Sequence, residues 1–202
     1  MRNCETIEHR LITEDDRFLR DESKMGGGYA EKVFFPENEE EISSILRLCA
    51  EKKTKVTVAG GGTGITGAAV PLGGLVISME KFNKIIGLGF ENDRFFLKVQ
   101  AAVTLSKIAE TMRAKDLSNL DDLTENARKS LEDSPVLWLY PVDPTEMSAQ
   151  IGGTAATNAS GAATYRFGPT RNWIKSIVVV LPDGQIHKIE RGKCFADALR
   201  RK

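Results

Sequence analysis

The uneven placement of glycine is the feature that most constrains the fold of this chain. Seven of the fifteen residues at 60–74 are glycine. In a second stretch, 149–163, twelve of the fifteen residues are glycine, alanine, serine or threonine. Glycine loses more conformational freedom on folding than any other residue, so such density opposes folding. Both stretches therefore indicate places where the backbone must come close to another group.

Composition excludes several classes of partner. A chain of 202 residues can bury a core as one large domain or two small ones. Its 28 basic and 28 acidic side chains give a net charge of zero, whereas nucleic acids and acidic membranes are bound by clustered positive charge. No apolar run approaches the roughly 20 residues of a membrane-spanning helix, and the charged residues 1–20 are unlike a signal peptide.

Cysteine and histidine are too sparse to indicate a metal centre. Cys4, Cys49 and Cys194 lie far apart and are odd in number, which argues against a disulfide framework and a cysteine-ligated metal. The two histidines, His9 and His187, are too few for a histidine-rich site. We expect no metal site, and we expect a reducing compartment, the cytoplasm.

Hydrophobic periodicity predicts strands and helices around the two stretches. Asn38 and Glu41 have the spacing of a capping box. The apolar residues after them recur at i, i+3, i+4 and i+7, which predicts a helix after a short strand at 33–35. A second helix is predicted from Thr104. Further strands are predicted at 56–58, 75–79 and 94–101.

The last third of the chain contains a polar segment and a hairpin. Residues 114–135 carry apolar side chains at helical spacing, which predicts a surface helical insertion. Pro182-Asp183-Gly184 is a turn sequence between two apolar runs, which predicts a hairpin. The expected organisation is an N-terminal arm at 1–32, a first subdomain at 33–101, a second at 102–190 and a tail at 191–202.

The first glycine stretch has three interpretations that involve phosphate. Consecutive residues without Cβ can turn several backbone N–H groups toward one anion. Gly62-x-Gly64-x-x-Gly67 also matches a dinucleotide fingerprint, but a Rossmann site needs the third glycine inside a helix, and Pro71 leaves no room for one. No Gly-Lys-Ser/Thr follows, which argues against a P-loop. We predict an anion site built from backbone amides, with a plain glycine-rich surface loop as the alternative.

The second stretch follows Pro141-Val142-Asp143-Pro144 and runs from 150 to 161. Its small side chains would let a flat, polar ring system lie against the backbone, with amides and carbonyls free to bind the ring edges. A tightly packed helix start or a β-bulge would explain the same composition. Taken alone, this stretch does not decide between a binding loop and a packing role.

In their order and their residue sequence, the two stretches together resemble the FAD-binding (PCMH-type) domain of the vanillyl-alcohol-oxidase/para-cresol-methylhydroxylase flavoprotein superfamily. Within it, the chain is most similar to the group of D-lactate dehydrogenase, D-2-hydroxyglutarate dehydrogenase and the flavoprotein subunit of glycolate oxidase. The resemblance covers about 33–190 and implies an α+β fold of two α/β subdomains with FAD between them. The matching segments are 59–71, 141–144, 151–161, 165–168, 171–173 and 178–184.

The resemblance also implies which residues contact FAD. The first loop would hold the pyrophosphate, residues near 141–150 would lie by the flavin and ribityl chain, the second loop would complete the site, and one strand would offer its backbone. In that order, these residues are Gly60, Gly61, Gly62, Thr63, Gly64, Gly67 and Ala68; Pro141, Asp143 and Gln150; Gly152, Gly153, Ala156, Thr157, Asn158 and Ser160; and Val180. Some family members attach FAD covalently through a histidine in the first loop. Thr63 stands at that position here, which implies non-covalent FAD.

The function that the resemblance implies is the FAD-binding portion of an oxidoreductase, which oxidises a 2-hydroxy acid by hydride transfer to FAD. The family's substrate-binding domain is not expected within these residues, so no catalytic residue is named. The alternatives are a non-catalytic flavin-binding subunit that needs a partner chain, and a nicotinamide-dependent Rossmann dehydrogenase. The expected partners are a small-molecule substrate in the complete enzyme, and either a partner chain or a second copy.

Overall fold

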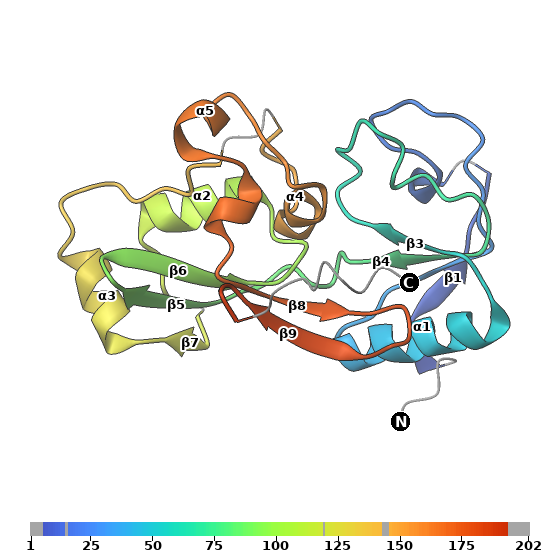
Figure 1. Cartoon of the computed structure of the whole chain (residues 1–202), viewed down its shortest axis with the longest axis horizontal. Coiled ribbons are helices and arrows are strands. Elements are labelled where there is room, and N and C mark those ends of the chain that lie inside the picture. Colours follow the sequence, from blue (N-terminus) through green and yellow to red (C-terminus); the bar gives the residue numbers. More distant parts are fainter. Residues whose placement is uncertain (1–5, 15, 119, 143–145, 194–202) are drawn as a thin grey trace.

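The computed structural model describes residues 6–14, 16–118, 120–142 and 146–193, which form an α+β fold (Figure 1). The described strands make one sheet of four strands, one of three and one of two. The first sheet lies on one side of the molecule and the second on the other, with the two-stranded hairpin running between them (Figure 1). The α+β class predicted from the sequence is confirmed.

The first sheet is mainly parallel, and both of its faces are covered. Its order is β1-β2-β4-β3, in which β1 is antiparallel to β2 and the other pairings are parallel. One face packs against a helix and the other against the segment that contains Phe18. The strands are β1 (His9–Leu11), β2 (Lys32–Phe34), β3 (Val56–Ala59) and β4 (Leu75–Ser78).

Helix α1 (Glu39–Lys52) forms as its capping sequence predicts. The Asn38 side chain accepts a hydrogen bond from the Glu41 N–H at 2.9 Å, and the Glu41 carboxylate accepts one from the Glu37 N–H at 2.9 Å. The first bond satisfies a donor that a helix start leaves unpaired, and the second fixes the residue that precedes the cap. The apolar side of α1 then packs Ile45 and Cys49 into the cluster on the first sheet.

The N-terminal region contributes to this sheet, although the sequence predicted an arm. Strand β1 pairs with β2, and Ile7 is buried in the cluster under α1. On the opposite face, Phe18 of η2 (Arg17–Leu19) packs against Val33 and Val76. Ile7, β1 and Phe18 are therefore part of the packed structure, while Gly26 and Gly27 are exposed, and residue 15 lies outside the described residues.

The second sheet has the order β6-β5-β7, with β5 (Ile85–Glu91), β6 (Arg94–Val99) and β7 (Asp122–Leu123). Helix α2 (Leu105–Ala114) begins at Thr104, as predicted, and its Met112 packs on this sheet. The sheets divide between Ser78 and Ile85, whereas the sequence led us to expect a division after residue 101.

The predicted surface insertion is a packed part of the second sheet. It supplies β7, which pairs with β5, and helix α3 (Glu125–Glu132). Ala127 and Leu131 of α3 are fully buried. Gly87 allows β7 to come this close, because a Cβ there would overlap the Asp122 backbone. The predicted surface helix is confirmed: most residues of α3 are exposed, and Ala127 and Leu131 anchor its inner side in the core.

The hairpin of β8 (Ser176–Val180) and β9 (Ile186–Glu190) confirms the predicted turn sequence. Its turn is fixed to α1, since the Ser43 hydroxyl donates a hydrogen bond to the Gly184 carbonyl at 2.5 Å. Val180 packs against a cluster that joins Ile42 of α1 to Phe82 and Ala102. Three short helices lie over the remaining side, as Figure 1 shows: α4 (Ile151–Thr157), α5 (Thr164–Phe167) and η3 (Thr170–Trp173).

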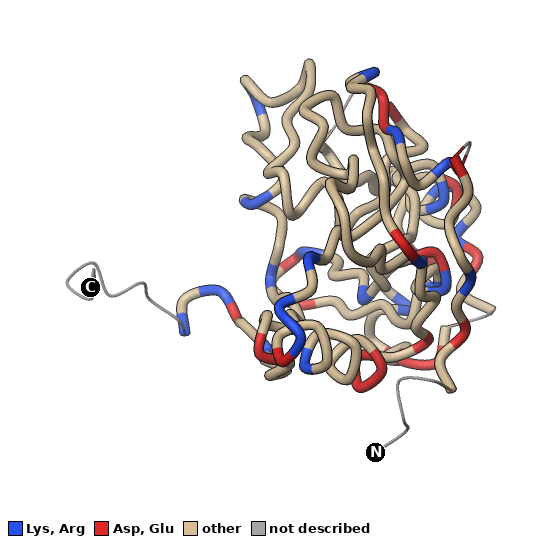
Figure 2. The backbone as a smooth tube through the Cα atoms, turned by 90° about the vertical axis from the view of Figure 1, so that its right-hand side faces the viewer, with Lys and Arg blue, Asp and Glu red and all other residues tan. Residues whose placement is uncertain are grey.

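Charges of both signs are interspersed over the described chain. Figure 2 shows acidic and basic residues mixed along the backbone, in agreement with the net charge of zero. Among the described helices, none has the length and apolar character that a membrane span requires.

The burial of α3 gives a stability prediction. Leu131→Ala should lower the free energy of unfolding by about 2–5 kcal/mol, because it removes a fully buried side chain and leaves a cavity. Lys129→Ala, on the exposed side of the same helix, should change it by no more than about 0.5 kcal/mol. Urea denaturation of the two variants measures the difference. Equal effects would show that α3 does not belong to the core.

Candidate functional site

The first glycine stretch forms a long loop between two parallel neighbouring strands. It leaves β3 after Ala59 and enters β4 at Leu75, and it contains no helix. Gly67 lies in a turn closed by a hydrogen bond from the Val70 N–H to its carbonyl at 3.1 Å. A Rossmann site would require a helix at this point. The structure therefore excludes the nicotinamide-dependent Rossmann alternative.

The backbone of residues 61–64 has the properties of an anion site. Among the described residues, no acceptor is found for the N–H groups of these four positions. Gly62 has a φ of +69°, which a side chain would strain, and a Cβ at Gly62 or Gly64 would meet nothing within 4 Å. Backbone donors without an acceptor in the described chain, on a loop with room beside it, are what a phosphate group needs.

The second stretch meets this loop at Gln150. A Cβ on Gly60 would lie 3.0 Å from the Gln150 side-chain oxygen, and one on Gly61 would lie 3.5 Å from the Gln150 Cγ and the Ser148 carbonyl. Gln150 immediately precedes α4 and forms an isolated β-bridge with Thr104. The structure thus brings the start of the second stretch against the first loop, although they are far apart in the chain.

Adjacent glycines of α4 face different surroundings. The Gly152 N–H donates to the Ala101 carbonyl at 2.8 Å, and a Cβ on Gly152 would come 2.7 Å from the Ala101 Cβ. Gly152 therefore permits close packing inside the protein. A Cβ on Gly153 would meet nothing within 4 Å, and Gly153, Ala156 and Thr157 are exposed on one side of the helix.

The rest of the second stretch is stabilised by its own hydrogen bonds. Asn158 ends α4 in the left-handed conformation, and its side-chain oxygen accepts a bond from the Arg171 N–H at 3.1 Å. The Ala159 carbonyl accepts bonds from the Thr170 N–H and hydroxyl at 3.0 and 2.8 Å. Asn158 thus orients the turn at η3, while Ser160 is exposed.

The remaining predicted positions differ in their surroundings. Pro141 is buried. In the first loop, Thr63 is half-buried between Gly62 and Gly64, and Ala68 is exposed. Val180 lies on β8, where its side chain packs in the apolar cluster beside α1. Asp143 lies outside the described residues, as does Pro144.

Two perturbed groups border the site. Burial raises the pKa of the Tyr140 hydroxyl, and interaction with the Thr170 hydroxyl offsets part of this effect, so Tyr140 stays neutral at physiological pH. Burial would also raise the pKa of Asp21, but the hydrogen bonds from Ser23, together with the nearby backbone of Ala69 and Gly67, outweigh it, and the pKa is lowered. Asp21 was not predicted as a site residue, and its local signal in the sequence is the Asp-x-Ser turn pattern.

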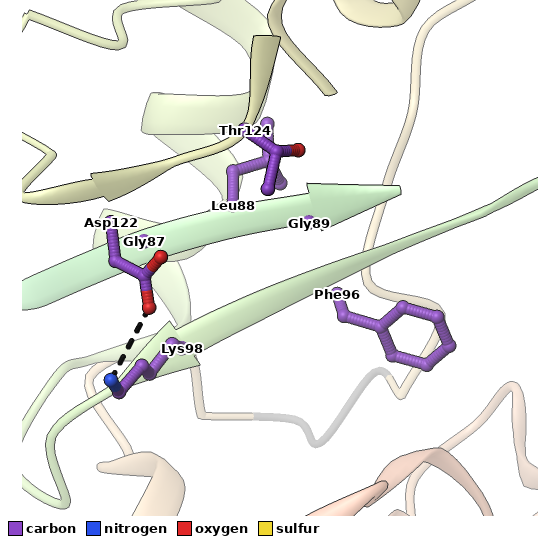
Figure 3. Close-up of a pocket in the computed structure, with 7 residues that line it drawn as sticks. All are labelled: Gly87, Leu88, Gly89, Phe96, Lys98, Asp122 and Thr124. Atoms are coloured by element: carbon purple, nitrogen blue, oxygen red, sulfur yellow. Dashed lines mark hydrogen bonds and ion pairs between the residues drawn. The ribbon is translucent and has the colours of Figure 1, made fainter. Parts of the chain in front are cut away.

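Two depressions elsewhere do not fit a nucleotide cofactor. The one in Figure 3 has a volume of about 90 Å³ and lies over β5, β6 and β7, beside the exposed Lys98–Asp122 ion pair at 3.3 Å. Ligand pockets are typically about 300–1,000 Å³. A groove of about 510 Å³ beside α1 is lined by Glu40, Glu41 and Arg47, and its two carboxylates against one guanidinium disfavour a phosphate. Neither depression is lined by the glycine loop.

Metal ligands are not clustered in the part of the chain that the structure describes, where no group of three or more histidine, cysteine, aspartate or glutamate residues could hold an ion. His9 bonds to the Ile7 carbonyl at 2.8 Å, and His187 lies exposed on β9. The described site is built from backbone, small side chains and the amide side chains of Gln150 and Asn158.

Comparison with known proteins agrees with this arrangement. The FAD binding domain family matches residues 30–120 and 134–190, and the gap between them contains all of α3. The chain is 35% identical to D-lactate dehydrogenase from Anaerostipes hadrus over 180 residues, which are 88% of this chain and 33% of that protein. It is 30% identical over 156 residues to a glycolate oxidase subunit from Bacillus subtilis, covering 76% of this chain and 28% of that protein.

Solved structures show the same fold at low sequence identity. 6-Hydroxy-D-nicotine oxidase from Arthrobacter nicotinovorans superposes with a TM-score of 0.66 at 15% identity, over 92% of this chain and 36% of the other. The chain spans about a third of the length of these proteins. It belongs to the family of FAD-binding domains, has the PCMH-type FAD-binding fold, and takes FAD as its cofactor.

Proposed function

We propose that this chain is the FAD-binding portion of an oxidoreductase that oxidises a 2-hydroxy acid of the D-lactate, glycolate or 2-hydroxyglutarate type. The observation that carries the proposal is the approach of Gln150 to Gly60 and Gly61, because it joins the two stretches that the sequence assigns to one cofactor. The relatives named D-lactate dehydrogenase and glycolate oxidase subunit supply the substrate class.

The residues present fit FAD. The N–H groups of residues 61–64, which have no acceptor among the described residues, would hold the pyrophosphate. The exposed side of α4 at Gly153, Ala156 and Thr157 would take a flat ring against the backbone. Gln150 would present its side-chain amide between them. FAD, when bound, supplies hydride acceptance, while the chain binds and orients it. The remaining predicted contacts, Asp143 and Val180 among them, stay part of the proposal.

The proposal also covers the cellular compartment of the protein and its association with other chains. A reducing compartment, the cytoplasm, is supported by three widely separated cysteines. Association with a partner chain or a second copy is supported by large apolar side chains that are exposed, including Leu137, Leu139 and Val178.

The first prediction concerns how FAD is held. The purified protein should be yellow, or become so with added FAD, and acid precipitation should release all of the flavin, because Thr63 offers no ring nitrogen for a covalent bond. Absorbance spectra of supernatant and pellet measure the distribution. Flavin that remains in the pellet contradicts non-covalent binding, and a protein that takes up no FAD contradicts the proposed function.

The second prediction concerns the two loops. Gly61→Asp and Gly153→Asp should each leave a folded domain, because neither position has a positive φ and a Cβ finds ordinary contact or open space. Each should weaken FAD binding by about a hundredfold or more, since a carboxylate near phosphate or ring repels and crowds the cofactor. Fluorescence titration with FAD measures the affinity.

The matched control is Gly26→Asp, which adds the same charge at an exposed glycine with open space. Its affinity for FAD should equal that of the unmodified protein. Unchanged affinity in Gly61→Asp would remove the first loop from the site, and unchanged affinity in Gly153→Asp would remove α4.

The third prediction concerns the reaction. When the 202-residue chain is loaded with FAD and kept anaerobic, D-lactate and glycolate should not bleach the flavin absorbance. Oxidation of a bound substrate needs a nearby base, and neither histidine lies at the two loops. Dithionite serves as the positive control. Rapid bleaching by either acid would show that a substrate site lies within this chain, and Arg166 and Arg171 would then be tested first.

A further inference from the structure

Helix α5 and the adjoining turn η3 expose three aromatic side chains, on a part of the protein that we call the α5–η3 surface. Tyr165 has a relative exposed area of 104%, so the folded chain covers none of its side chain. Phe167 and Trp173 are 36% and 40% exposed, and their rings meet edge to face with centroids 6.5 Å apart. Large apolar side chains gathered on a surface mark a site of association. The FAD site proposed above uses residues 61–64 and α4, and does not account for these rings.

Hydrogen bonds fix the α5–η3 surface in the protein alone. The Trp173 Nε1–H donates a hydrogen bond to the Phe167 carbonyl at 3.0 Å, which ties η3 to the end of α5. Thr170 is fully buried, and its hydroxyl donates to the Ala159 carbonyl at 2.8 Å, which ties η3 to the segment after α4. A surface that is already ordered loses less conformational entropy when a partner binds. Phe167 and Trp173 are therefore oriented before any partner arrives.

Three arginines give this surface a positive charge. The Arg166 guanidinium lies 5.2 Å from the centroid of the Phe167 ring, and Arg171 is exposed on η3. The Arg191 guanidinium donates hydrogen bonds to the Ile174 carbonyl at 2.9 Å and to the Arg171 carbonyl. Within the described residues, none of these arginines forms an ion pair with a carboxylate. The positive charge of the surface is therefore not balanced from inside the described protein.

The chain around this surface supplies no negative charge either. Residues 147–182 contain no aspartate or glutamate, although the whole chain has 28 acidic residues. Lys175, the lysine of this range, is already paired with the Glu91 carboxylate at 2.6 Å. A second copy that docked through the same surface would bring arginines against arginines, because a two-fold contact uses the same patch on both sides. Like charges oppose such a contact, so a partner for this surface must bring negative charge.

We infer that the α5–η3 surface binds an acidic surface of another protein chain. Carboxylates of that chain pair with Arg166 and Arg171, and an apolar or aromatic side chain packs on Phe167 and Trp173. Tryptophan, tyrosine and arginine are the residue types that contribute most to the binding energy of protein interfaces. The inference deepens the proposed function, on whose association with a partner chain it rests, and it does not depend on FAD binding.

A random copolymer of glutamate and tyrosine serves as an acidic, aromatic probe. When the labelled copolymer is titrated with the full 202-residue chain, its fluorescence anisotropy should rise, and added salt should weaken the binding. Arg166→Gln combined with Arg171→Gln should weaken binding at least about tenfold, since two charge-assisted contacts are lost. The matched control is Arg128→Gln combined with Lys129→Gln, which removes two exposed charges on α3, away from α5 in Figure 1. The control should leave the affinity unchanged.

Tyr165→Ser separates a direct contact from an effect on stability. Because the folded chain covers none of the Tyr165 side chain, the urea midpoint should stay unchanged, while the copolymer should bind about tenfold more weakly. No binding of the copolymer, equal weakening by the two pairs of substitutions, or full affinity in Tyr165→Ser would overturn the inference.

Other occupants of the surface give different results. A dimer in analytical ultracentrifugation that Tyr165→Ser dissociates would place a second copy on this surface. Tighter binding of a single-stranded oligonucleotide or of phosphatidylglycerol vesicles than of the copolymer would show another class of partner. Each of these results would overturn the inference. If the unmodified protein binds the copolymer as expected but takes up no FAD, the FAD-binding role fails, whereas the inference about the acidic partner stands.

Discussion

The parallel pairing of β3 with β4 is the constraint on which the site depends. Parallel neighbours cannot be joined by a tight turn, because the chain must return along the length of the sheet, usually through a helix. Here residues 60–74 make that return without a helix. A segment without internal ladder bonds must find other partners for its backbone groups. The lack of a crossover helix thus leaves amides available to bind something else.

The N-terminal segment provides many of those partners. The Tyr29 N–H donates to the Pro71 carbonyl at 2.9 Å, and the Tyr29 carbonyl accepts the Gly73 N–H at 2.8 Å. The Glu31 N–H donates to the Gly74 carbonyl at 2.8 Å. These bonds continue toward β2, where the segment becomes a strand of the same sheet. The second half of the loop is therefore held by the protein, while residues 61–64 keep unpaired donors among the described residues.

Local sequence patterns predicted most helices and strands, whereas contacts between residues far apart in the chain could not be predicted from them. Asn38 and Glu41 fix the start of α1 through contacts within one turn, so the sequence alone revealed it. Strand β5 was not predicted because Gly87 and Gly89 interrupt its apolar run, yet Gly87 is needed for the approach of β7. The missing helix after Gly67 was foreseen from Pro71. The contact of Gln150 with the loop could not be read from spacing, because it depends on how two sheets pack.

Gly152 and Gly153 show why composition alone could not separate packing from binding. Each costs a helix about 1 kcal/mol relative to alanine, and nothing in the sequence distinguishes the two. The structure explains Gly152, because Ala101 leaves no space for a Cβ. It offers no such internal reason for Gly153, whose missing side chain faces open space on the exposed side of α4. Gly153 therefore destabilises the helix without serving the packing of the described protein. Close approach of a bound group would explain why glycine stands there, which supports the proposal that α4 contacts the cofactor.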